Sequence, residues 1–271
     1  MTDAHHSRPA AAHLPPALAD AWTALLRPCA RLRHAADGEP VAAVLGGTPH
    51  LPAATPWPEW PGHGPLSFVA SVDCAALPRE SLSEEFPPDG TLLFFFWDGR
   101  LGDDVFVSAH DPETWIGAQV LYVPRDTPTA AADTPAPLTP YPRVDLTAGT
   151  EESAPDLLLP QSRRALLGDT RPWPHPRETP PELRPFVRAF SRLRTSAGHQ
   201  IGGHAIPLQG PVEHEISGGS DEEAERWVPL AQFDSDLGMS WGGDEGTLYW
   251  LIRPEDLAAR RFDLARFTGQ S

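Results

Sequence analysis

The stretch "AQFDSDLGMSWGGDEGTLYWLI", residues 231–252, contains the pattern from which the fold of this chain is best predicted. It begins and ends with short apolar runs that are typical of β-strands, and between them lie four acids and four glycines. Glycines permit the sharp turns that a short connection needs. We therefore expect "DSDLGMSWGGDEG", residues 234–246, to be a loop between two strands, "WVPLAQF" and "TLYWLI".

A similar series of segments occurs earlier in the chain, in the same order. "VLGGTPHLP" (44–52) is similar to "QIGGHAIPL" (200–208), "LSFVASVDCAAL" (66–77) to "WVPLAQFDSDLG" (227–238), and "DGTLLFFFW" (89–97) to "DEGTLYWLI" (244–252). The series predicts an α+β, β-dominated fold with two related lobes that derive from an internal repeat. At least one glycine of each Gly-Gly pair is expected at φ > 0. The run "TLLFFFW" predicts a strand that is covered on both faces. The run "VFVSA" (105–109) is also typical of a β-strand.

The rest of the chain predicts helices and connections around these lobes. Helical spacing of apolar residues predicts amphipathic helices over about 18–32 and 183–193. Thirteen prolines between 124 and 181 predict an irregular connection that contains one short helix. The predicted organisation is a disordered segment 1–12 and a single domain 13–271, with lobe one at 41–123, the Pro-rich connection at 124–181, and a helix plus lobe two at 182–271.

Composition argues against several classes of partner. The formal charge of −16 disfavours nucleic acid and anionic membranes, because both attract basic surfaces. All 21 basic residues are arginine, so Schiff-base chemistry on lysine is excluded. The two cysteines have no metal-binding spacing, and neither a signal peptide nor a membrane span is evident. We expect a cytoplasmic protein.

The same segments resemble the YwqG-like family, a bacterial domain family of uncharacterised function. The N-terminal signature is seen in "GGTPHLPAATPWP" and "LSFVASVD", and the C-terminal signature in "HQIGG", Gln209, "LAQFDSD" and "WGGDEGTLYWLI". The resemblance extends over roughly residues 41–267. It departs at Ser71, where the family usually has glutamine, and at Gly243, which is an insertion. The resemblance implies a mixed, β-rich fold and no established reaction.

Three kinds of chemistry can be weighed against simpler explanations. "GMSWG", residues 238–242, matches a nucleophile elbow, but no helix follows it and no histidine occurs after His214. The acids of the 234–246 loop offer oxygen ligands to Ca²⁺ or Mg²⁺, yet aspartates also accept main-chain hydrogen bonds in turns. Asp73 and Asp234 hold matching places in the two lobes and could form a carboxylate pair. His199 and His204 have no third metal ligand nearby in sequence.

These observations favour a non-catalytic binding or interaction protein that uses a cleft between two related lobes. Its partner, a protein or a small molecule, is unknown, and no cofactor, metal ligand or catalytic residue is assigned. The alternative is a hydrolase or a divalent-metal-dependent enzyme that uses the acidic loop. The predicted ligand-binding residues are Gln200, Gly202, Gly203, Gln209, Gln232, Asp234, Asp236, Trp241 and Asp244.

Overall fold

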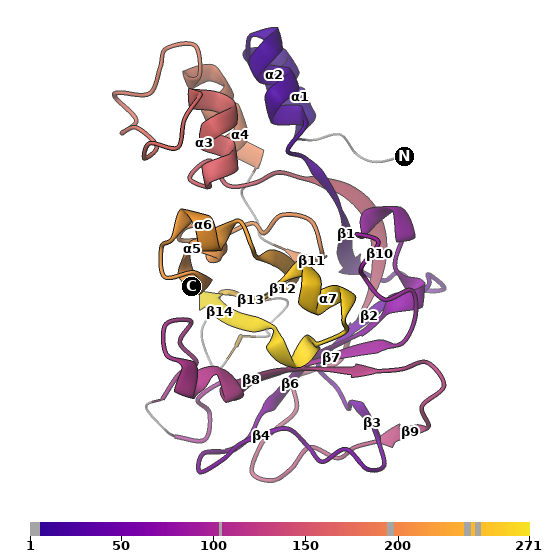
Figure 1. Ribbon diagram of the computed structural model, residues 1–271. Coiled ribbons are helices and arrows are strands. Elements are labelled where there is room, and N and C mark those ends of the chain that lie inside the picture. The colour runs from indigo at the N-terminus through magenta and orange to yellow at the C-terminus, as the bar shows by residue number, and fades with distance from the viewer. Residues whose placement is uncertain (1–5, 103–104, 194–197, 236–239, 242–244) are drawn as a thin grey trace.

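The fold is built on one antiparallel sheet (Figure 1). The computed structural model describes residues 6–102, 105–193, 198–235, 240–241 and 245–271. Within these residues ten strands pair in the order β14–β13–β12–β11–β1–β10–β2–β6–β7–β8. The long strands β1 (Arg27–His34) and β10 (Val144–Ser153) form the middle of this sheet.

Four strands continue the sheet on each side of the central pair. The strands beyond β10, which we call the first half, are β2 (Ala43–Leu45), β6 (Ser67–Asp73), β7 (Thr91–Phe96) and β8 (Ala118–Val123). The strands beyond β1, which we call the second half, are β11 (His199–Ile201), β12 (Val228–Asp234), β13 (Thr247–Ile252) and β14 (Arg266–Gln270). Two small two-stranded sheets lie apart, β3 (His50–Pro52) with β9 (Thr129–Ala131) and β4 (Glu59–Trp60) with β5 (Gly64–Pro65).

The two halves pair their strands in matching registers. In each half an aspartate that ends one strand pairs with a threonine that begins the next (Asp73 with Thr91, Asp234 with Thr247). Each of these pairings is also interrupted at the corresponding place, between Phe68 and Ala70 in one and between Pro229 and Ala231 in the other. The run "TLLFFFW" and the run "TLYWLI" therefore occupy corresponding strands, β7 and β13. A common origin of the two halves from a repeat stays a prediction.

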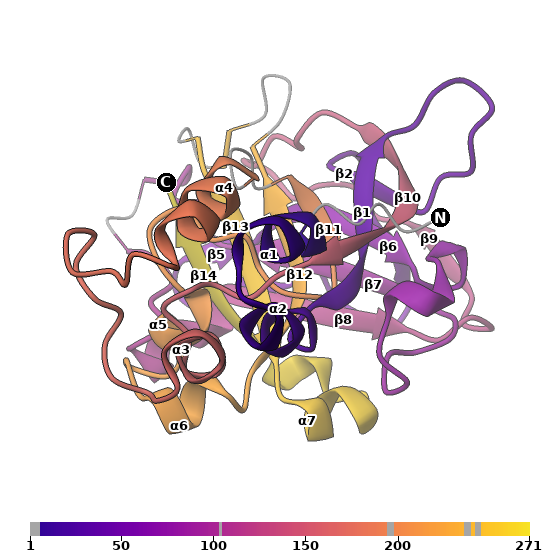
Figure 2. The ribbon, with the colours of Figure 1, turned by 90° about the horizontal axis from the view of Figure 1, so that it is seen from above.

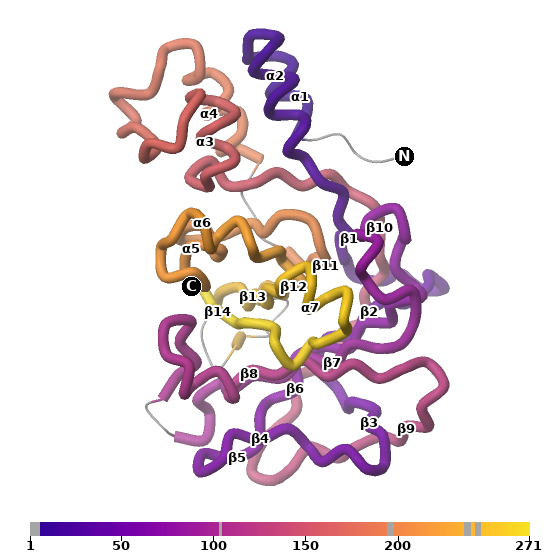
Figure 3. The backbone as a smooth tube through the Cα atoms, in the orientation of Figure 1, coloured from indigo at the N-terminus to yellow at the C-terminus, as the bar shows by residue number. Residues whose placement is uncertain are grey.

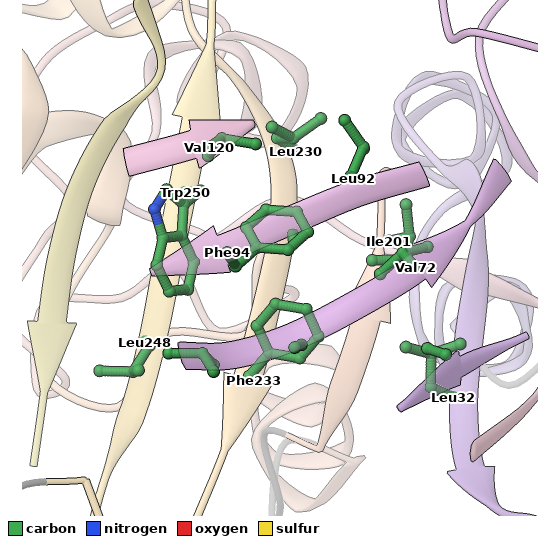
Figure 4. Close-up of a cluster of buried hydrophobic side chains, with 14 of the residues drawn as sticks. Leu32, Val72, Leu92, Phe94, Val120, Ile201, Leu230, Phe233, Leu248 and Trp250 are labelled. Atoms are coloured by element: carbon green, nitrogen blue, oxygen red, sulfur yellow. The ribbon is translucent and has the colours of Figure 1, made fainter. Parts of the chain in front are cut away.

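The sheet curves so that its two halves pack face to face. Figure 4 shows strands of the first half crossing those of the second, with side chains of both between them. The Phe94 ring lies 5.1 Å from the Phe233 ring and 5.1 Å from that of Trp250, both in edge-on contacts. Burial of these large side chains supplies the main hydrophobic contribution to stability. The space between the halves is thus largely filled with side chains.

The outer faces of β7 and β13 are covered as well. Leu93 and Phe95 of β7 pack in a second apolar cluster with residues that precede β6 in the chain, among them Trp60 and Leu66. Tyr249 and Leu251 of β13 pack under helix α5 (Val212–Ile216) in another. Because alternate side chains of a strand point to opposite faces, cover on both sides explains why these strands read as continuous apolar runs. The prediction for β7 is confirmed.

Most helices gather at one end of the molecule (Figures 1 and 2). They are α1 (Ser7–His13), α2 (Pro16–Thr23), α3 (Pro160–Leu167) and α4 (Arg184–Leu193). Trp22 packs edge-on against Phe186 and Phe190, with ring centroids 5.1 and 5.2 Å apart. The shorter helices α6 (Asp221–Ala224) and α7 (Pro254–Ala258) lie beside the second half (Figure 3). None of the described helices has the length and apolar character that crossing a membrane requires.

Four sequence predictions need correction. Residues 7–12 are helical and not disordered, because Pro9 and Ala10 are buried in the helical cluster. The helix predicted over 18–32 ends at Thr23 and strand β1 follows, since Pro28 cannot supply the N–H that a helix interior needs. The Pro-rich connection contains β10, which is held by its pairing with β1 and not by apolar alternation. The run "VFVSA", residues 105–109, forms no strand. The short helix (α3) and the helix over 183–193 (α4) are confirmed.

Candidate functional site

The acidic loop connects β12 to β13, as predicted, and its first aspartate acts within the fold. The Asp234 carboxylate accepts hydrogen bonds from the Gly198 and Ser235 main-chain N–H groups at 3.1 and 3.0 Å. It also accepts one from the Thr247 hydroxyl at 2.8 Å. Asp234 therefore serves the turn, as an aspartate commonly does. Asp236 and Asp244 lie outside the described residues.

Gln200 and Gln232 lie side by side on β11 and β12, and both are buried. The Gln232 side chain accepts from the Ile206 N–H at 3.0 Å and donates to the Gly198 carbonyl at 2.9 Å. The Gln200 amide donates to the Gly202 and His204 carbonyls at 2.7 and 2.9 Å. Gln200 thus holds the chain that follows β11, and Gln232 holds the chain on both sides of it. Their role in ligand binding stays a prediction.

The other predicted residues of the described part of the chain lie in separate places. Gln209 bonds to the main chain of Ser271. Trp241 is buried and packs edge-on against Tyr141, with ring centroids 5.2 Å apart. Gly202 and Gly203 lie elsewhere, in the turn after β11. The structure therefore does not bring the whole predicted set together at one site.

Both Gly-Gly turns use the left-handed backbone, as predicted. Gly46, Gly47, Gly202 and Gly203 have φ values of 55°, 71°, 67° and 69°. A Cβ on Gly203 would lie 2.5 Å from the Ser153 hydroxyl and 2.6 Å from Cys29 Cβ, so this position also needs glycine for space. Gly202 and Gly203 form part of the wall of a cavity, which gives them a place at the candidate site described next.

A pocket of about 300 Å³ opens between the two halves of the sheet. We call it the apolar pocket, because its surface is mainly apolar and its wall includes Leu82, Phe86, Val228, Leu230 and Leu257. The first half contributes the segment 81–86, which connects β6 to β7, and the second half contributes the start of β12 and helix α7. The volume lies at the lower end of the range of about 300–1,000 Å³ for small-molecule sites.

Arg27, the first residue of β1, lies at the junction of the apolar pocket with a second cavity. Arg27 as a whole is exposed to solvent, although part of its side chain is buried. Within the described residues, no hydrogen bond or ion pair joins its guanidinium to another group. Burial of that part of the side chain lowers the pKa of Arg27, and the Glu213 carboxylate acts in the opposite direction. Arg27 is thus a partly desolvated cation, open to a ligand, that has donors to offer.

The second cavity, of about 180 Å³, we call the polar pocket. Its wall includes Gln161, His204, Glu213 and Trp227. The His204 ring contacts the Leu25 carbonyl at 2.8 Å through Nε2, which must carry a proton to donate to that oxygen. Burial, and then the positive charge of Arg27, lower the pKa of His204 to about 3, so this ring is neutral near pH 7. Gln161 Oε1 is buried and has no hydrogen-bond donor within the described residues.

The sequence alone did not identify Arg27 or the segment 81–86 as site residues. The segments that form the apolar pocket are far apart in the chain and carry no shared motif. The one available signal was the Gly-Gly turn at 202–203, which marked part of the wall.

The described residues also bear on the catalytic alternatives. They contain no group of three or more His, Cys, Asp or Glu side chains that could hold a metal ion. His199 Nδ1 accepts from the Asp234 N–H at 3.1 Å, and His204 is engaged as above. Asp73 accepts from the Ala75 N–H at the start of a short helix, so it and Asp234 each serve their own turns. Burial raises the pKa of Cys29 to about 11 and that of Cys74 to about 12, so both thiols are protonated near pH 7.

Comparison with known proteins places the chain in a family. Residues 43–270 match the family model described as a domain of unknown function (DUF1963), and the chain belongs to this family. The match spans both halves of the sheet and most of the wall of both pockets. No curated protein matches the chain.

Proposed function

We propose that this chain is a small-molecule-binding protein whose ligand occupies the apolar pocket. One observation carries the proposal: a cavity of about 300 Å³ lies between two halves of a sheet that are otherwise in close side-chain contact. Protein interiors are close-packed, so an apolar cavity of this size that opens to solvent is a typical binding site.

The residues that line the pocket favour a ligand with a small apolar group and not the flat surface of a protein partner. Leu82 and Phe86 of the first half and Leu230 and Leu257 of the second all line the cavity. Burying an aromatic or branched aliphatic group among them contributes roughly 25 cal/mol per Å² of apolar surface removed from water. Both halves supply wall residues, so a ligand would also stabilise the contact between them.

The proposal is tested by closing the pocket. Val228 is half-buried at the start of β12 and lines the cavity, so Val228→Phe fills part of its volume. Calorimetric titration with phenylalanine, phenylpropionate, phenethylamine and benzyl alcohol should detect at least one ligand for the parent protein. Val228→Phe should weaken that ligand by about tenfold or more, which corresponds to about 1.4 kcal/mol.

A matched substitution controls for the added bulk. Val41 is 40% exposed and lies outside the cavity, so Val41→Phe should bind the ligand as the parent protein does. Unchanged affinity in Val228→Phe, or no binding of any of the four compounds to the parent protein, would overturn the proposal.

A further inference from the structure

The apolar and polar pockets are neighbours, because Arg27 and Pro229 line both. One ligand can therefore place an apolar group in the first and its polar groups beside the second. Given the proposed function of the apolar pocket, the polar pocket determines which polar groups such a ligand carries.

The Arg27 guanidinium favours a negatively charged hydrogen-bond acceptor on the ligand. Its guanidinium has five N–H donors, and within the described residues none of them makes a hydrogen bond or an ion pair. Arg27 is exposed and interacts with the Glu213 carboxylate through charge but not through a hydrogen bond, so its N–H donors are open to a ligand. A carboxylate satisfies arginine in a planar, two-point contact. A ligand carboxylate at this junction would meet that need.

The polar pocket calls for the opposite, a donor. Gln161 Oε1 is buried without a donor, and the wall also holds the carboxylates of Glu213 and Glu225. Glu213 is buried, and Glu225 forms an ion pair with Arg164. The Leu25 carbonyl is already taken by the His204 ring, which is neutral near pH 7. Apart from Arg27, the charged groups that line this pocket are the carboxylates of Glu213 and Glu225, which favour an ammonium group over a second anion there.

We propose that the two pockets together bind an α-amino acid with a large apolar side chain, in its zwitterionic form. The side chain fills the apolar pocket and the carboxylate lies against Arg27. The ammonium group donates to Gln161 Oε1 and faces Glu213. A cavity of about 300 Å³ is large enough for one benzyl or branched aliphatic group.

Three compounds separate the contributions of the two charges. Phenylalanine carries both, phenylpropionate lacks the ammonium group, and phenethylamine lacks the carboxylate. In calorimetric titrations of the full chain near pH 7, phenylalanine should bind at least about tenfold more tightly than either of the others. Each charge-assisted hydrogen bond adds affinity, and the other two compounds each lack one charge. This comparison needs no substitution and therefore does not depend on how a variant folds.

Two substitutions assign each charge to its residue. Arg27→Gln should lower the affinity for phenylalanine and for phenylpropionate by about tenfold. The affinity for phenethylamine, which has no carboxylate, should stay the same. Gln161→Leu should lower the affinity for phenylalanine and for phenethylamine. The affinity for phenylpropionate, which has no ammonium group, should stay the same. Arg33→Gln is the matched control, because Arg33 is exposed at the other end of β1 and pairs with Glu39.

The outcomes also distinguish this inference from the proposed function. If phenylpropionate, phenethylamine or benzyl alcohol binds as tightly as phenylalanine and Val228→Phe weakens it, the pocket binds apolar ligands and the zwitterion proposal is wrong. If Arg27→Gln leaves phenylalanine affinity unchanged, the carboxylate assignment is wrong. If none of these compounds binds the parent protein, both proposals are overturned.

Discussion

The two halves of the sheet share a strand framework but differ in what covers it. On β7, Leu93 and Phe95 point outward and pack in an apolar cluster with Trp60 and Leu66. On β13, the corresponding Tyr249 donates its hydroxyl to the Ile206 carbonyl at 2.9 Å, beneath the turn after β11. The first half is thus covered by apolar contact, and the second by apolar contact under helix α5 together with buried hydrogen bonds.

This difference arises at a few matched positions. The strand pairings place Val44 and Ser71 in the first half where Gln200 and Gln232 stand in the second. The two glutamines bind the main chain of the segment that follows β11, and that segment carries His204 to the polar pocket. The same framework therefore builds a plain apolar cover on one side and the wall of a candidate site on the other.

The largest expected effect concerns the contact between the halves. Phe94→Ala and Trp250→Ala should each lower the free energy of unfolding by about 3–5 kcal/mol, because each leaves a cavity in the common core. The two rings touch, so the double variant should depart from additivity by about 0.5 kcal/mol or more.

Chemical denaturation of the three variants measures this coupling. Phe106→Ala is the control and should change stability by less than about 0.5 kcal/mol, because that ring is 73% exposed. Additive losses for Phe94 and Trp250 would show that the halves do not stabilise one another through these rings.

The next effect concerns the matched glycine turns. Gly46→Ala and Gly203→Ala should each cost about 2–4 kcal/mol, since a strained backbone and a steric overlap add together. A Cβ at Gly46 would lie 2.3 Å from the Pro142 carbonyl oxygen, whereas at Gly202 the nearest atom is 3.5 Å away. Gly202→Ala should therefore cost only the backbone strain, about 1 kcal/mol.

Thermal unfolding of the three variants ranks these costs. Gly38 also has a positive φ, of 83°, and no atom lies within 4 Å of the position that a Cβ would take there. Gly38→Ala therefore isolates the backbone strain. Equal losses at Gly38 and Gly203 would contradict the steric part of this explanation.

The Gly-Gly turns and four of the strands are the part of the fold that local sequence predicts best. The turns have a backbone requirement that is met within a few residues. The strands β6, β7, β12 and β13 are apolar runs, which predict strands without long-range information. The central strands are different. Cys29 and Leu32 of β1 have a spacing that also suits a helix, and β10 has a mostly polar sequence. Their pairing is long-range, as is the assembly of the apolar pocket, so neither could be predicted from neighbouring residues.

A smaller effect is expected from the polar network of the second half. Gln232→Leu should lower stability by about 1–3 kcal/mol, because the Ile206 N–H and the Gly198 carbonyl lose their partner. Ser71→Ala at the matched position of the first half should change it by less than about 0.5 kcal/mol. Denaturant titration checks both values, and a cost at Ser71 equal to that at Gln232 would remove the contrast drawn between the two covers.

The last prediction concerns pH, and it also belongs to the second half alone. His204 follows the second Gly-Gly turn, and the residue that follows the first turn is Thr48, which is exposed and does not titrate. Because burial lowers the pKa of His204 from 6.5 to about 3, the unfolded chain binds a proton between these pH values and the folded chain does not. The contribution to stability is therefore fully present above pH 6.5 and is lost as the pH falls toward 3, by up to about 1.4 kcal/mol per pH unit.

Two measurements separate this contribution from that of the carboxylates, which also lose stability in acid. Denaturation at several pH values should give a shallower acid loss for His204→Gln than for the parent chain, whereas His110→Gln, at an exposed position, should follow the parent. If His204→Gln folds poorly, the ring proton of His204 can be followed by NMR in the parent chain, where its resonance should not shift between pH 7 and 5. Titration of that resonance near the ordinary pKa of histidine would mean that the polar pocket admits water freely to this ring, and the partial desolvation inferred for Arg27 beside it would then be wrong as well.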